Sequence, residues 1–185
     1  MTAPNVGNPT HPAVMNQMRL PRSAALGPGR GGQQRLLIDA PAGAAEIYLH
    51  GATVTSWVPR GASEVIFTSR QAVFDGATAI RGGIPLCLPE FGVGINSDAV
   101  PKHGWARIAP WRLLTVTATD GGGVRALLSV SRDRLTALYE VEVGETLRLG
   151  LSLRNEGTEP RTVEAAAHTY LSVHDVTASR ISGLA

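Results

Sequence analysis

Residues 146–154 read TLRLGLSLR, and this run places a leucine at every second position from Leu147 to Leu153. Successive side chains of a β-strand point to opposite faces, so a period of two puts all four leucines on one face. The run ends at residues 155–157 (NEG), which favour a turn. The segment therefore predicts a strand with one apolar face.

Strand signals recur on both sides of this run. Short apolar or alternating stretches occupy residues 36–38, 46–50, 53–58, 65–67, 111–119, 124–130, 138–143 and 162–173. Turn residues separate them, most clearly the DGGG of residues 120–123. Residues 127–138 leave the choice between helix and strand open. Many short strands joined by turns predict an all-β fold, an antiparallel sandwich or barrel.

The first 34 residues differ from the rest of the chain. They are rich in Pro, Gly, Asn and Ala and show no periodicity, which predicts a flexible leader at 1–34 and a single folded domain at 35–185. The formal net charge of +2 comes from residues 1–35, whose four arginines leave 13 basic and 15 acidic side chains in the remainder. We therefore expect no basic face for nucleic acid.

Composition and termini set further expectations. The 185 residues are 43% hydrophobic and 17% charged, as in a globular domain, and the single cysteine, Cys87, excludes an internal disulfide framework. Without a signal peptide or membrane span in the sequence, we expect a cytoplasmic protein. Residues 179–185 (SRISGLA) resemble the interior of a strand or turn, so we expect an incomplete sheet whose open edge allows self-association.

Two phrases about 20 residues apart place charge among glycines and prolines. IRGGIP carries Arg81, and KHGWAR carries Lys102, His103 and Arg107. Glycine lets backbone approach a ligand closely, and guanidinium groups suit phosphate or vicinal hydroxyls. The pattern predicts a site for an anionic, polar ligand such as a sugar phosphate. Taken singly, each residue also fits an ordinary surface, ion-pair or backbone-bonded role.

His168 lies among small residues in AAAHTY. This setting predicts a deeply set imidazole suited to proton transfer, and a structural core histidine is the alternative. Phe91 and Trp105 are candidates for an apolar floor under a sugar ring, with ordinary core packing as their alternative. A metal site is not predicted, because no close His, Cys and carboxylate spacing recurs.

The ordered set of phrases resembles the glucose-6-phosphate 1-epimerases, which are hexose-6-phosphate mutarotases of the aldose 1-epimerase superfamily. The matching stretches are residues 49–52, 55–57, 72–75, 80–85, 103–107 and 167–170. The resemblance covers residue 35 to the end. It implies a galactose-mutarotase-like antiparallel supersandwich that interconverts the α and β anomers of a hexose 6-phosphate without a cofactor.

Residue roles follow from this resemblance alone. It implies that Arg81 and Arg107 bind the substrate and its phosphate, that His168 is the general acid, and that a glutamate much later in the family's sequence is the general base. Lys102 stands where the family usually has glutamine, and we place it with His103 among the substrate-binding residues. The chain ends soon after the His168 motif, without a counterpart of that glutamate.

Three functions stay open at this point. The chain is a mutarotase, a truncated and inactive relative with residual sugar-phosphate binding, or a carbohydrate-binding sandwich without catalysis. Glu90, Asp98 and Glu164 are the acidic residues that could replace the missing base. We do not favour this replacement, because Glu164 and His168 would lie about 13 Å apart on one face of a regular strand.

Overall fold

The computed structural model describes residues 18–95 and 101–183. Its elements in chain order are β1 (Ala24–Pro28), η1 (Arg30–Gly32), β2 (Gln34–Ala40), β3 (Gly43–Tyr48), β4 (Thr53–Pro59), β5 (Leu86–Cys87), η2 (Ala106–Ile108), β6 (Arg112–Ala118), β7 (Val124–Arg132), β8 (Leu135–Val143), β9 (Leu147–Asn155) and β10 (Ala166–Ala167). Here η marks a 3₁₀ helix. None of the helices in these ranges has the length and hydropathy to cross a membrane. The predicted all-β fold is confirmed.

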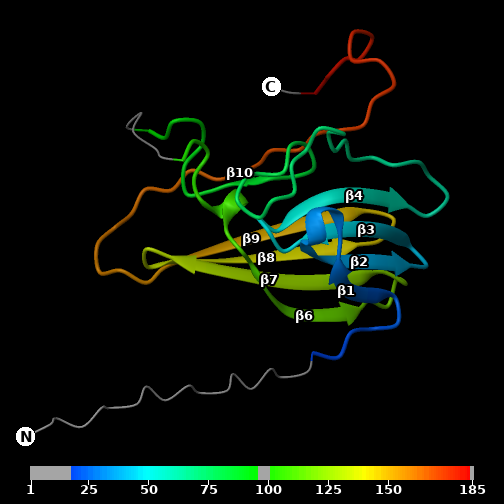
Figure 1. The fold of residues 1–185 in the computed structure, drawn as a ribbon, viewed down its shortest axis with the longest axis horizontal. Coiled ribbons are helices and arrows are strands. Elements are labelled where there is room, and N and C mark those ends of the chain that lie inside the picture. The colour runs from blue at the N-terminus through cyan, green and yellow to red at the C-terminus, as the bar shows by residue number, and fades with distance from the viewer. Residues whose placement is uncertain (1–17, 96–100, 184–185) are drawn as a thin grey trace, which may run out of the picture.

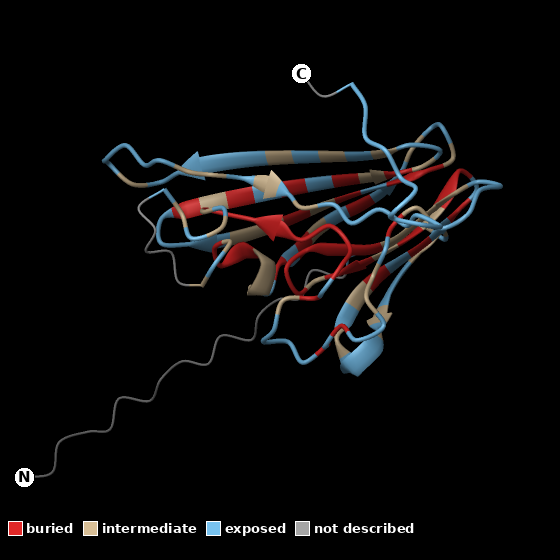
Figure 2. Cartoon of the chain, turned by 90° about the horizontal axis from the view of Figure 1, so that it is seen from above, coloured by how far each residue is buried: buried red, intermediate tan, exposed pale blue. Residues whose placement is uncertain are grey.

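Two four-stranded antiparallel sheets share one core (Figure 1). Their orders are β1-β2-β3-β4 and β6-β7-β8-β9, so each sheet is a meander of consecutive strands. Alternate residues point inward, such as Leu36 and Ile38 on β2 and Leu135 and Tyr139 on β8, all of them buried. Figure 2 shows this alternation of buried and exposed residues along the strands. The period-two pattern in the sequence therefore fixes which face of each strand lies in the core.

Residues 127–138 belong to the β7–β8 hairpin and not to a helix. The register runs from Val124 opposite Val143 to Arg132 opposite Leu135. Asp133 and Arg134 form the two-residue turn, with φ angles of 51° and 58°. Positive φ at both turn residues matches the twist of paired strands. The turn contains no glycine, which is why the sequence pattern did not reveal it.

The leucine run forms β9, at the edge of its sheet. Leu147, Leu149 and Leu151 are half-buried, and Leu153 is 38% exposed. The prediction that these leucines share one face is confirmed by the alternating burial. The leucine face is therefore only partly covered. Within the described ranges β9 pairs with β8 alone, so the other edge of the strand is open.

Strand β1 corrects the leader predicted at residues 1–34. Ala24–Pro28 pair in antiparallel register with β2, which itself begins at Gln34. Proline and glycine are tolerated at the end of an edge strand, so the composition of this segment concealed its structure. Residues 1–17 of the predicted leader lie outside the described residues.

The segment between β4 and β6 is tied to the sandwich by short pairings. β5 pairs with β10, and isolated bridges join Val54 to Ile84 and Thr68 to Gly82. The strand predicted at 65–67 is reduced to a single bridge between Ile66 and Leu171. Both phrases singled out in the sequence lie in this segment.

Candidate functional site

A cavity of about 530 Å³ brings Arg81 and Arg107 together. Its lining also includes Tyr170, Ile108 and much of the loop from Gln71 to Gly82. None of the described residues that line it is acidic. The two arginines predicted to bind one ligand therefore line the same cavity, and their side chains give its lining a positive charge.

Arg81 is exposed, but the backbone around it is tightly fixed. Its carbonyl accepts the amide of Ser69 at 3.0 Å, and the bridge between Ile84 and Val54 holds the following residues against β4. Gly83 has a φ of 73°, and a Cβ there would lie 2.5 Å from the Val54 carbonyl oxygen. Only glycine suits this close approach, so the glycines of IRGGIP hold Arg81 at a fixed distance from the sheet.

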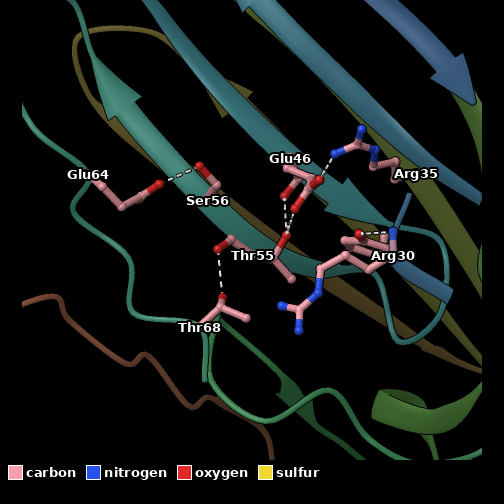
Figure 3. Close-up of polar contacts among 8 residues, drawn as sticks. Arg30, Arg35, Glu46, Thr55, Ser56, Glu64 and Thr68 are labelled. Atoms are coloured by element: carbon pink, nitrogen blue, oxygen red, sulfur yellow. Dashed lines mark hydrogen bonds and ion pairs between the residues drawn. The ribbon is translucent and has the colours of Figure 1, made fainter. Parts of the chain in front are cut away.

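The strand-like stretch before this loop is fastened to β4 by side chains (Figure 3). The Thr68 hydroxyl donates to the Thr55 carbonyl at 2.7 Å. The Glu64 carboxylate accepts from the Ser56 hydroxyl and from the Trp57 amide. These bonds substitute for a regular ladder and position the start of the cavity wall.

Arg107 lies on η2 and is half-buried. Its Nη2 donates to the Lys102 carbonyl at 2.9 Å, while its Nε is buried without a hydrogen-bond partner in the described structure. A buried donor without an acceptor is costly. The side chain of Lys102 is exposed and does not line the cavity.

His103 is held by reciprocal hydrogen bonds with Gly92. The Gly92 amide donates to its Nδ1 at 3.1 Å, and its own amide donates to the Gly92 carbonyl at 2.7 Å. Because Nδ1 accepts, the neutral ring carries its proton on Nε2. Burial lowers the pKa of His103, and the positive charges of Arg107, His168 and Lys102 lower it further. The imidazole therefore presents a neutral N–H donor.

His168 follows β10 and stands beside His103 and Tyr170. Its ring stacks on Tyr170 at a centroid distance of 4.9 Å and meets His103 edge-on at 6.2 Å. Its amide donates to the Pro85 carbonyl at 3.0 Å, which fixes its backbone beside β5. His168 is half-buried, so the expected deep setting was wrong, since β10 is itself half-buried to exposed where it pairs with the buried β5.

The two aromatic candidates, Phe91 and Trp105, lie in different surroundings. Phe91 is 46% exposed and lies 5.2 Å from the ring of His103 and 6.4 Å from that of His168. Trp105 is 5% exposed and belongs to the main core, which is the ordinary packing role given above as the alternative to a ligand floor. The small residue Gly104 turns the chain between His103 and Trp105, with a φ of 68°, and sends the two rings apart.

The sequence predicted no site role for Tyr170 or for residues 71–79 of the cavity wall. Tyr170 lies two residues after His168, so the strand period could have placed both on one face. The loop offers no such signal, because its shape depends on distant partners. One of them is the buried His50, whose Nε2 lies 2.9 Å from the Thr78 carbonyl.

The acidic residues considered as a replacement base lie elsewhere. Glu90 and Glu164 line a second cavity of about 340 Å³, and the Glu164 carboxylate accepts the Phe91 amide at 3.2 Å. Asp98 lies outside the described residues. Among the residues described, no three His, Cys, Asp or Glu side chains gather in a way that could hold a metal ion.

Several known proteins are similar to this chain. "Putative glucose-6-phosphate 1-epimerase" of Escherichia coli (strain K12) is 32% identical over 158 residues, which make up 80% of this chain and 52% of that protein. The protein of the same name from Cenchrus ciliaris is 35% identical over 157 residues, or 76% and 47%. The chain thus spans about half the length of the curated relatives it matches.

A solved structure and a family profile agree with these relatives. The crystal structure of "a putative mutarotase" from Salmonella typhimurium superposes with a TM-score of 0.75 at 28% identity, covering 85% of this chain and 54% of that one. The sequence profile described as Aldose 1-epimerase matches residues 34–185, which is most of the chain. By this match, its relatives and its fold, the chain belongs to the aldose 1-epimerase family.

Proposed function

We propose that this chain binds a hexose 6-phosphate such as glucose 6-phosphate and takes part in interconverting its α and β anomers. The observation that carries this proposal is the cavity shared by Arg81, Arg107 and Tyr170, with His168 stacked on Tyr170. The names of the curated relatives point to the same substrate.

Charge and size support a sugar phosphate as the ligand. Two guanidinium groups face a cavity without acidic lining residues in the described chain, which suits a phosphate dianion. The volume of about 530 Å³ lies within the usual range for small-molecule sites.

Mutarotation by acid and base catalysis requires two proton transfers. A base takes the proton of the C1 hydroxyl while an acid protonates the ring oxygen, and the C1–O5 bond breaks. Rotation about C1–C2 and reclosure give the other anomer. We assign the acid to His168, and the neutral Nε2–H of His103 donates a hydrogen bond that orients the sugar. The exposed ring of Phe91 packs against the apolar face of the sugar.

Binding without turnover is a second candidate function. No carboxylate lines the cavity in the described structure, and a positioned base contributes about 10²–10⁴-fold to such reactions. If no other residue takes the proton of the C1 hydroxyl, the chain keeps the phosphate-binding arginines and the acid but lacks the base. It then accelerates anomer exchange only slightly.

Calorimetry and a coupled mutarotation assay on the full chain test both candidates. We expect glucose 6-phosphate to bind more tightly than glucose, and Arg81→Ala or Arg107→Ala to weaken binding by about 10–100-fold. Arg112→Ala, at an exposed position of β6, is the matched control. Activity that falls in His168→Ala while binding persists favours the mutarotase. If the wild-type chain binds glucose 6-phosphate but its mutarotation rate equals that of His168→Ala, the second candidate is favoured. If glucose binds as tightly as glucose 6-phosphate, both candidates are excluded.

A further inference from the structure

Arg30 contacts the loop that walls the cavity, although it does not line the cavity itself. Its guanidinium carbon lies 4.2 Å from the ring centroid of Phe74. Its Nη2 reaches the carbonyl oxygens of Arg70 and Ala72 at 3.4 and 3.5 Å. One side chain therefore engages both the backbone and an aromatic ring of the same loop.

The backbone around Arg30 is docked on the same cluster. Its amide donates to the hydroxyl of Tyr48, the last residue of β3, at 2.9 Å. The Tyr48 and Phe74 rings lie 4.8 Å apart and form a small second core with Ala72 and Ile80. This second core is the floor on which the loop rests.

The loop has few other supports. It contains no strand between Gln71 and Ile80. Its far end is held by His50 at the Thr78 carbonyl and by an internal turn, in which the Asp75 carboxylate accepts the amides of Ala77 and Thr78. These amide bonds lower the pKa of Asp75 to about 2. The near end, from Arg70 to Phe74, is held by the second core, by Arg30 and by the bonds of the Gln71 and Ala72 amides to Ser69.

We propose that Arg30 is a positioning residue for the anion site. It clamps residues 70–74 onto the sheet, so that the wall from Gln71 to Arg81 keeps the shape that holds a phosphate. The stretch before β2 thereby becomes part of the binding apparatus without touching the ligand. The proposal rests on the proposed function for the identity of the ligand, and on the loop contacts for the clamp itself.

Hydrogen exchange and glucose 6-phosphate binding on the full chain test the clamp. Arg30→Met keeps an apolar stem over Phe74 but loses the cation and its donors. We expect the Ala72 amide to exchange about 5–30-fold faster and the affinity to fall by about 3–30-fold. Arg30→Lys keeps the cation and should show a smaller loss. Arg22→Ala, exposed in the same segment, is the matched control.

The two readouts separate the possible failures. A folded Arg30→Met protein with unchanged loop exchange overturns the clamp, and so does unchanged affinity measured well below its unfolding temperature. If Arg30→Met does not fold, Arg30→Lys decides by the same measurements. If the wild-type chain binds no glucose 6-phosphate, the proposed function fails, and loop exchange still decides whether Arg30 clamps the loop.

Discussion

The sheet β6–β9 and the segment between β4 and β6 are built in opposite ways. The sheet joins long strands through short turns, and each strand bonds to its neighbour in sequence. The described residues of the segment, 60–95 and 101–111, form one two-residue strand and one single-turn helix, and isolated bridges and side-chain bonds to backbone hold their shape. The comparison indicates that stability resides mainly in the first region, while the second carries most of the wall of the proposed ligand cavity.

The largest expected effect tests the sheet. Leu128 on β7 is fully buried, so Leu128→Ala should lower the free energy of unfolding by about 2–5 kcal/mol, measured by urea denaturation. Leu138→Ala is the control, because Leu138 on β8 is 38% exposed, and it should lower the free energy of unfolding by less than about 1 kcal/mol. Both variants should bind glucose 6-phosphate normally once folded. A loss of affinity in folded Leu128→Ala would break the division between the two regions.

The next effect tests the segment. Gly83→Ala places a Cβ against the Val54 carbonyl at a positive φ, which should cost about 1–3 kcal/mol and displace Arg81. Gly61→Ala has a similar φ of 69° but open space around the new Cβ. We expect calorimetry to show weaker glucose 6-phosphate binding for Gly83→Ala and unchanged binding for Gly61→Ala. Equal affinities in the two variants would contradict a fixed Arg81.

A smaller effect concerns the open edge of β9. We propose that the chain self-associates through this edge, as expected from its partly covered leucines. Leu153→Lys should then shift sedimentation toward the monomer, because an edge charge opposes strand pairing. Leu37→Lys, at a 43% exposed position of the inner strand β2, is the control. A wild-type chain that stays monomeric at high concentration contradicts the proposal.

The smallest expected effect is a pH dependence of folding stability that arises from His103. Its pKa is lowered in the folded state, so the unfolded chain binds more protons between the folded pKa and the unfolded value near 6.5. Stability should therefore fall as the pH drops through 6.5 and level off below the folded pKa. His103→Asn removes the titration and tolerates the φ of 64°. Denaturation midpoints between pH 5 and 8 should vary less in that variant, and identical slopes would refute the assignment.

Most strands could be predicted because their burial alternates. β2, β4, β6 and β9 all lie where short-range patterns placed them. β1 was not predicted, because an edge strand rich in Ala, Gly and Pro shows no alternation of apolar and polar residues. The β7–β8 turn escaped because Asp133 and Arg134 adopt positive φ without glycine. Local patterns thus fail where a tertiary contact imposes the backbone.

The candidate site was predictable in its residues but not in its geometry. The resemblance named Arg81, Arg107 and His168, while nothing in residue type decides that Trp105 packs inward and Phe91 outward. Arg30 could not be singled out at all. Its partner Phe74 lies far along the chain, and only the folded loop brings the two together.

The pairing of residues 166–172 with the region around residues 65–87 has a consequence for the order of events during synthesis. Tyr170 donates to Gly83 and accepts from Phe67, and His168 donates to Pro85. A growing chain can complete the hairpins of β1–β4 early, because their contacts are local. The wall of the cavity that holds Arg81 and Arg107 must wait until Tyr170 has been made. The nascent chain therefore acquires a sheet long before it acquires this cavity.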